Sequence, residues 1–243
     1  MMRRFWLACG WLLSGAAWAE APVLTVDLYT LDYPPFVTKE DGKPPRGIAV
    51  DLAMAALSRA GLRGQVVDLP WKRAQMQVMN EPLSCLMPLT RSAKREEQYR
   101  WVGMIDNSQQ SLFVIKTRPG HLRGLNDLKG LRIVTLLGSS MAEWLRLHNV
   151  AFSELPTTED AYRELSLGVA DAWAVHGPVA RYLVKKQGSS AVPIREELRL
   201  QETSVYFACS KRMPQAVAKS LEEAFQSLRS SGETARIMSH YLD

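Results

Sequence analysis

Short strands alternate with helices along most of this chain, and that alternation limits its fold more than any other feature. Residues 23–31 alternate apolar and polar side chains as a half-buried strand does, and residues 47–61 form a mostly apolar helix closed by a glycine. A strand, a helix and another strand are predicted next, over 63–70, 71–80 and 83–89. Strands joined by helices form βαβ units, so we predict an α/β protein with a largely parallel sheet covered on both faces.

The same alternation restarts in the second half of the chain. A strand, a Gly-Ser-Ser turn and a helix occupy residues 127–150. A capped helix, a strand, a helix and a strand follow, over 153–168, 170–177, 178–188 and 202–212. An amphipathic helix with Pro214 in its first turn and a short final helix, 233–242, end the chain. We therefore expect two α/β units, joined by strands near 113–116 and 204–209.

The N-terminal residues predict export. Arg3 and Arg4 precede an apolar run over 5–13, and Ala17-Trp18-Ala19 ends the segment with small residues. This pattern is typical of a secretory signal peptide over residues 1–19. A membrane anchor would need about 20 apolar residues, and Cys9 lies too early in the run to be a lipidation site. We therefore expect a periplasmic protein.

Composition excludes several classes of function. Removing residues 1–19 takes away two arginines and no acids, which lowers the formal charge from +5 to +3. A nucleic-acid binder would carry a denser basic stripe, so we expect no nucleic-acid partner. The histidines, at 121, 148, 176 and 240, lack the spacing of metal ligands, and the chain has no phosphate-binding glycine loop. We expect neither a metal nor a cofactor.

Two cysteines, Cys85 and Cys209, remain after the predicted cleavage. An oxidising compartment permits a disulfide between them. Two buried thiols that act as small apolar side chains are an equal alternative. Sequence does not give the Cα separation that decides between the two states.

In their order and spacing, several segments resemble the periplasmic solute-binding proteins of the polar amino-acid type, bacterial extracellular solute-binding protein family 3. No single segment is highly specific, but together they cover nearly the whole mature chain. They are "YPPF" after the first strand, "GIAVDLAMAALSRAG", "TRSAKREEQYRW", "DLKGLRIVTLLGSS", "GVADAWAVHG" and "SSGETARIMSHYL".

The resemblance implies a two-lobe periplasmic-binding-protein-like fold of type II, in which each lobe is a mixed sheet flanked by helices. Lobe 1 would be discontinuous, residues 20–114 plus 204–243, and lobe 2 would comprise 115–203. A two-strand hinge would let the lobes close on a small ligand. The expected partners are a small polar or carboxylate ligand and an inner-membrane ABC permease or sensor, and the protein is expected to be a monomer.

Four residues of lobe 1 are candidate ligand contacts. Arg95 matches the carboxylate-binding arginine of the family, and its guanidinium can grip a carboxylate through two parallel hydrogen bonds at what we predict to be a helix start. Thr90 can add its hydroxyl. Tyr33 matches an aromatic residue that stacks on ligands, with packing on the adjacent prolines as the alternative. Trp71 is equally compatible with a cavity wall and with a core residue.

Lobe 2 adds Ser139 and His176. Ser140 and Glu143 have the spacing of a capping box, so Ser140 has a structural explanation and Ser139 is the better ligand candidate. In amino-acid binders of this family, an acidic residue that grips the ligand ammonium occupies the place of His176. An imidazole is a poor partner for an ammonium and a good donor to an anion or carbonyl. Asp171 could replace the missing acid only under a different register.

Three functions are compatible with this pattern. The first is a binding protein that captures a small polar, carboxylate-bearing solute for transport or sensing, which requires no catalytic residue. The second is a dehydratase-like enzyme on the same fold, with His176 as base or Glu96 as acid. The third is a sensory or interaction accessory that has lost its ligand.

Overall fold

The computed structural model of the protein describes residues 23–242. The predicted signal peptide, residues 1–19, lies outside this range. Within it, none of the helices combines the length and the apolar character that crossing a membrane requires.

Eight strands form one continuous sheet in the order β2-β1-β3-β8-β4-β7-β5-β6. The pairs of β1 with β2 and β3, and of β5 with β6 and β7, are parallel, whereas the pairs of β8 with β3 and of β4 with β7 and β8 are antiparallel. The sheet is therefore mixed. The strands are β1 Thr25–Thr30, β2 Arg63–Asp68, β3 Ser84–Thr90, β4 Tyr99–Ile115, β5 Ile133–Leu136, β6 Ser153–Leu155, β7 Ala172–His176 and β8 Ile194–Ser210.

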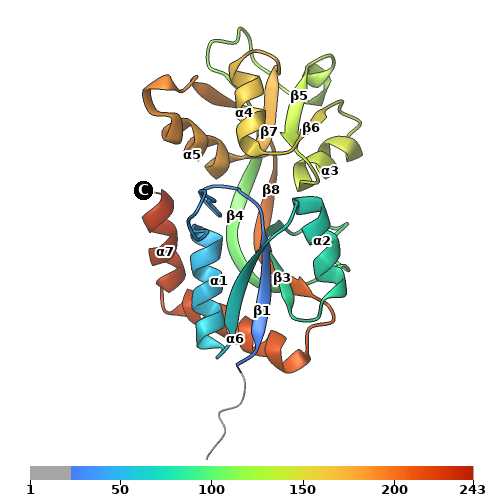
Figure 1. Ribbon diagram of the computed structural model, residues 1–243. Coiled ribbons are helices and arrows are strands. Elements are labelled where there is room, and N and C mark those ends of the chain that lie inside the picture. Colours follow the sequence, from blue (N-terminus) through green and yellow to red (C-terminus); the bar gives the residue numbers. More distant parts are fainter. Residues whose placement is uncertain (1–22, 243) are drawn as a thin grey trace, which may run out of the picture.

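The two long strands, β4 and β8, run through both halves of the molecule and connect its two lobes (Figure 1). The lower lobe contains β1, β2 and β3, and the upper lobe contains β5, β6 and β7. Because β4 and β8 pair with each other along their length, they make a two-strand hinge. They also continue past residues 114 and 204, so the lobe boundaries at these positions remain a prediction.

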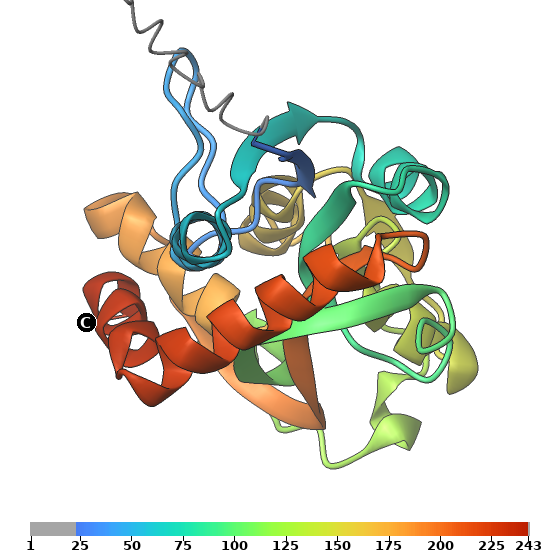
Figure 2. The ribbon, with the colours of Figure 1, turned by 90° about the horizontal axis from the view of Figure 1, so that it is seen from below.

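Helices cover both lobes. The helices are α1 Ile48–Arg59, α2 Trp71–Asn80, α3 Ser140–Leu147, α4 Thr158–Ser166, α5 Gly177–Gln187, α6 Gln215–Ser230 and α7 Glu233–Leu242, with short 3-10 turns η1 Leu125–Leu128 and η2 Gly188–Ser190. The helix α6 crosses beneath the lower lobe, where it packs on α1 and β4 (Figure 2). Leu221, Phe225 and Leu228 on its apolar face are buried. Pro214 precedes α6 rather than lying in its first turn, because the helix begins at Gln215.

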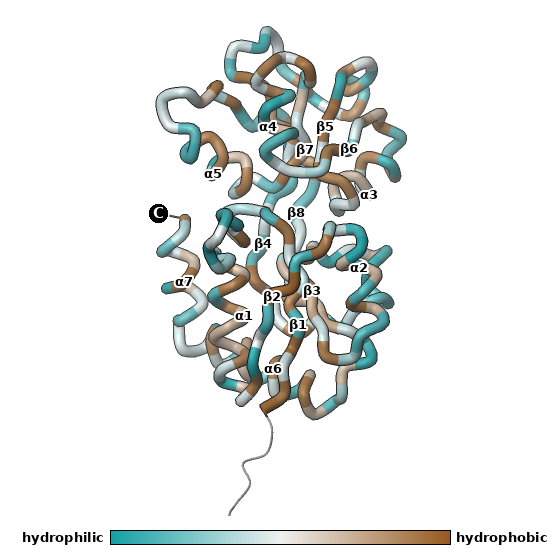
Figure 3. Tube along the Cα trace, in the orientation of Figure 1, coloured by the Kyte–Doolittle hydropathy of each residue, from teal (hydrophilic) through white to brown (hydrophobic). Residues whose placement is uncertain are grey.

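Apolar residues follow the strands through both lobes, whereas the helices alternate apolar and polar faces (Figure 3). Trp173 of β7 and Phe207 of β8 are fully buried. Cys85 and Cys209 lie opposite each other on β3 and β8 and form a disulfide, which decides the question that sequence left open.

Two sequence predictions were wrong in local detail. The segment after β3, residues 91–98, forms successive turns and not the start of a helix. The backbone N–H groups of Arg95 and Gln98 close turns onto the carbonyls of Ser92 and Arg95. The strands predicted near 113–116 and 204–209 are also much longer than expected, because each passes between the lobes.

Candidate ligand-binding site

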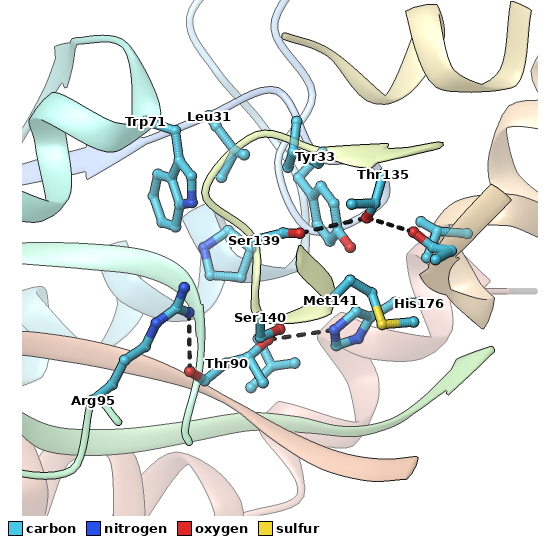
Figure 4. A pocket seen from close by; sticks show the side chains of 15 residues that line it. Leu31, Tyr33, Trp71, Thr90, Arg95, Thr135, Ser139, Ser140, Met141 and His176 are labelled. Carbon is cyan, nitrogen blue, oxygen red and sulfur yellow. Dashed lines mark hydrogen bonds between the residues drawn. The ribbon is translucent and has the colours of Figure 1, made fainter. Parts of the chain in front are cut away.

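A cavity lies where the two lobes meet, and all six residues predicted as ligand contacts line it (Figure 4). Hydrogen bonds from Arg95 to the Gly138 carbonyl and to Glu143 cross from one lobe to the other beside it, so the lobes are closed on each other in this structure. The lining residues are Leu31, Tyr33, Trp71, Pro88, Thr90, Arg95, Thr135, Leu136, Ser139, Ser140, Met141, Ala174, Val175, His176 and Val205.

The lower lobe supplies an aromatic wall and a cation. Tyr33 follows β1 in the "YPPF" loop and is half-buried against Phe36, with ring centroids 6.2 Å apart. Trp71 is half-buried and begins α2, so its indole faces the cavity rather than filling the core. Thr90 ends β3, and Arg95 reaches the cavity from the turns that follow.

Arg95 is the one buried cation of the 90–101 segment, with 3% of its surface exposed. Its Nη1 donates to the carbonyl of Thr90 at 3.3 Å. Its Nη2 donates to two groups of the upper lobe, the carbonyl of Gly138 at 3.1 Å and Oε1 of Glu143 at 3.0 Å. The guanidinium is thus held by hydrogen bonds from both lobes.

The other cations of this segment do not line the cavity. Arg91 donates from Nε to Glu96 at 2.8 Å and lies over the rings of Trp101 and Tyr206. Lys94 is exposed, and Arg100 donates to the Gln215 side chain at 2.6 Å. Glu96, one of the two groups considered for catalysis, is therefore paired outside the cavity.

The serine that caps α3 is Ser139 and not, as the sequence predicted, Ser140, while Ser139 also lines the cavity. The helix α3 begins at Ser140, and Ser139 has extended backbone angles and caps it, accepting from the Ala142 N–H at 3.1 Å. Ser140 is not the cap. Its hydroxyl instead accepts from Nε2 of Gln110 at 2.7 Å. Because Ser139 is the cap, Glu143 takes no part in the predicted capping box. Its carboxylate instead accepts from Arg95 across the cleft.

His176 ends β7 and is buried, and its hydrogen bonds fix the position of its proton. Oε1 of Gln110 accepts from Gln201 at 2.7 Å, so the Gln110 amide nitrogen is the group that lies 2.7 Å from Nε2 of His176. With the amide oriented this way, Nε2 is the acceptor and the neutral ring carries its proton on Nδ1. Thr90 Oγ1 lies 3.3 Å from the same Nε2. Among the described residues, Nδ1 has no partner although it is buried.

Burial lowers the pKa of His176 to about 4, because the low-dielectric interior disfavours the imidazolium. The ring is therefore neutral at pH 7. Burial also raises the pKa of Tyr33, whose ring meets His176 edge-on at 6.0 Å. Asp171, the acid considered as a substitute, pairs instead with Arg132 at 2.8 Å and does not line the cavity.

The pKa of His176 predicts a loss of stability in acid. Since the pKa is lower in the folded chain than the ordinary 6.5, the unfolded chain binds more protons between these values. The stabilisation is present above pH 6.5 and is lost as pH falls toward 4, by about 3 kcal/mol. Urea unfolding at pH 7.5 and pH 4.5 measures it. His176→Asn should remove this part of the pH dependence, and equal pH dependence in both proteins would contradict the assignment.

Two contributors to the site were not found from sequence. Gln110 sits in the middle of β4 and orients His176, and Glu143 pairs with Arg95 from the opposite lobe. Gln110 belongs to no recognisable motif, Glu143 was assigned to a capping box, and each acts on a residue far away in the chain. The pairing follows only from lobe closure, which local patterns do not encode.

Residues 28–243 match the bacterial extracellular solute-binding proteins, family 3. The L-cystine-binding protein TcyJ of Escherichia coli (strain K12) is 27% identical over 177 residues, which cover 71% of this chain and 66% of TcyJ, slightly less than two thirds of its length.

Solved structures show the same fold. A histidine kinase sensor domain with similarity to periplasmic binding proteins superposes with a TM-score of 0.81 at 21% identity, covering 90% of this chain and 96% of that one. The ligand-binding core of GluR0 from Nostoc punctiforme, in complex with L-glutamate, gives 0.77 at 23% identity, with 90% and 99% covered. The match over nearly all described residues, together with the two-lobe fold, establishes that the chain belongs to the bacterial extracellular solute-binding proteins, family 3.

Proposed function

We propose that the protein captures a small solute that bears a carboxylate and lacks an α-ammonium group, in the periplasm, and presents it to an inner-membrane ABC permease or to a sensor. One observation supports the ligand class. Among the described residues, one arginine and one neutral histidine with an unused Nδ1–H line the cavity, and no aspartate or glutamate does, since Glu143 lines the neighbouring groove. These groups donate hydrogen bonds to oxygen atoms and offer no carboxylate to an ammonium.

The rest of the lining suits a small organic acid. Tyr33, Trp71, Leu136, Met141 and Val175 form apolar walls, and the hydroxyls of Thr90 and Ser139 are available beside them. A few fixed polar groups in an apolar cavity are sufficient for selective capture. The bound carboxylate would lie on Arg95, with a second ligand oxygen accepting from His176 Nδ1.

Two similar proteins support a role in solute binding and a role in sensing. TcyJ is an L-cystine-binding protein, and the histidine kinase domain is a sensor. An amino-acid ligand is the main competing proposal, since GluR0 binds L-glutamate. The absence of an acid from the lining argues against it.

Native mass spectrometry of the protein purified from its own periplasm tests this proposal. We expect a co-purified organic acid without an amino group, released on denaturation. An amino acid held in the cleft would refute the ligand class. Protein that carries nothing, and shows no thermal stabilisation by a library of carboxylic acids, would favour the ligand-free accessory.

The enzyme alternative has weaker support. A dehydratase needs a general acid or base placed on its substrate. His176 accepts from Gln110 with its unprotonated nitrogen and has a pKa near 4, which makes it a weak base. Glu96 lies outside the cavity. The structure of an ancestral amino-acid-binding protein described as a precursor of cyclohexadienyl dehydratase has this fold, at 18% identity and a TM-score of 0.77, but fold alone does not assign the reaction.

A further inference from the structure

Arg95, the proposed carboxylate grip, already holds a carboxylate in the closed structure. Oε1 of Glu143 accepts from its Nη2 at 3.0 Å, and the guanidinium is 3% exposed while the Glu143 side chain is 20% exposed. Both N–H groups of Arg95 Nη2 are in use, and a ligand carboxylate that binds the guanidinium through two parallel bonds would need one of them.

Glu143 is held from the lower lobe by both of its oxygens. Ser92 Oγ donates to Oε2 at 3.3 Å, while Arg95 binds Oε1. Since Glu143 belongs to α3 of the upper lobe, these contacts join the two lobes. Arg95 also donates across the lobes to the Gly138 carbonyl, whereas the contacts from Gln75 to Gly138 and between Thr90 and His176 involve neutral groups.

We propose that Glu143 is an internal substitute for the ligand carboxylate, which joins the lobes through Arg95 and which a solute carboxylate must displace. This rests on the proposed function of Arg95. A neutral solute gains too little on Arg95 to break a charge-assisted bond, whereas an anion replaces it with an equivalent one. Because a ligand must break the Arg95–Glu143 pair to reach Arg95, Glu143 weakens the binding of neutral ligands more than the binding of anions.

The structure provides room for the displaced side chain. A groove of about 690 Å³ lies on the other side of the Arg95–Glu143 pair, and Thr90 and Ser140 line both this groove and the ligand cavity. Glu143 itself lines the groove, as does Lys94, an exposed cation. A rotation of the Glu143 side chain into this space leaves its carboxylate solvated. It also vacates the donors on Arg95.

The first test measures how compact the ligand-free protein is in solution. Small-angle X-ray scattering of the mature wild-type protein should give a compact particle with a radius of gyration of about 17 Å. Glu143→Gln and Arg95→Gln should both give a larger radius, because each removes the ion pair from one side. Glu97→Gln is the matched control, since Glu97 pairs with Lys211 within the lower lobe. Variants as compact as wild type would overturn the proposal.

Competition is tested second, with glutarate as the probe in isothermal titration calorimetry. Glu143→Gln should bind glutarate at least about tenfold more tightly than wild type, because the binding-competent state is no longer a minor population. Equal or weaker binding would show that Glu143 positions Arg95 and does not compete. If neither protein binds glutarate, the proposed ligand class fails for this probe, and the closing role of Glu143 is then decided by the scattering alone.

Discussion

Replacing Arg95 with alanine is expected to weaken binding of the physiological carboxylate by about 1,000-fold. Removal of one partner from a buried, hydrogen-bonded charge pair costs about 4 kcal/mol, and Arg95 is buried between the lobes with three acceptors around it. The solute identified by native mass spectrometry serves as titrant, and calorimetry measures the dissociation constant. Arg95→Lys should recover only part of the affinity, because an ammonium cannot make two parallel bonds.

Arg91→Ala is the control for this change. Arg91 lies four residues earlier in the same turns but is paired with Glu96 and stacked over Trp101, outside the cavity. Its removal should leave affinity within a factor of about two, as for most exposed charges. Unchanged ligand-induced stabilisation in Arg95→Ala, with both proteins folded, would remove Arg95 from the site.

Substituting His176 with aspartate is expected to reverse the ligand preference. The carboxylate would accept from Gln110 and Thr90, as the ring nitrogen does now, and would face the cavity with a charge that pairs with an ammonium. The comparison uses L-glutamate and glutarate, which differ only in the α-amino group. We expect the ratio of their affinities to shift by about 10⁴ in favour of L-glutamate, since an unpaired buried group strongly rejects the wrong ligand.

His176→Asn separates charge from shape. Asparagine has nearly the size of aspartate but no charge, so it should lose the wild-type ligand without gaining L-glutamate. If the asparagine and aspartate variants prefer the same ligand, the histidine does not determine selectivity. Preference of the wild-type protein for L-glutamate over glutarate would contradict the assignment directly.

The regular elements of the fold were predictable from sequence because each carries its own period. The strand over 23–31 and the helix over 47–61 appear as β1 and α1 within a few residues. The full length of β4 was not predictable, because its central residues, from Asn107 to Gln110, are polar. These residues lie where β4 passes between the lobes. Their neighbours there are residues of the ligand site and the hinge, not an apolar core.

The candidate site was predictable in composition and less so in its contacts. The six proposed contacts lie around one cavity because the ends of β1, β3, β5 and β7 all face the cleft, and strand ends can be located from sequence. The serine that caps α3 depends on which residue adopts the extended conformation, and both candidates are serines. The partner of Arg95 is Glu143, which lies on the other lobe and 48 residues later in the sequence.

The disulfide has a consequence for how the protein tolerates cleavage. Cys85 and Cys209 are 124 residues apart, and the whole upper lobe lies between them in the chain. The disulfide therefore closes a covalent loop of the chain that contains the whole upper lobe. A protease that cuts once within β5, α4 or α5 would leave two fragments that the disulfide in the lower lobe still joins. The cleaved protein would keep both sides of its cleft.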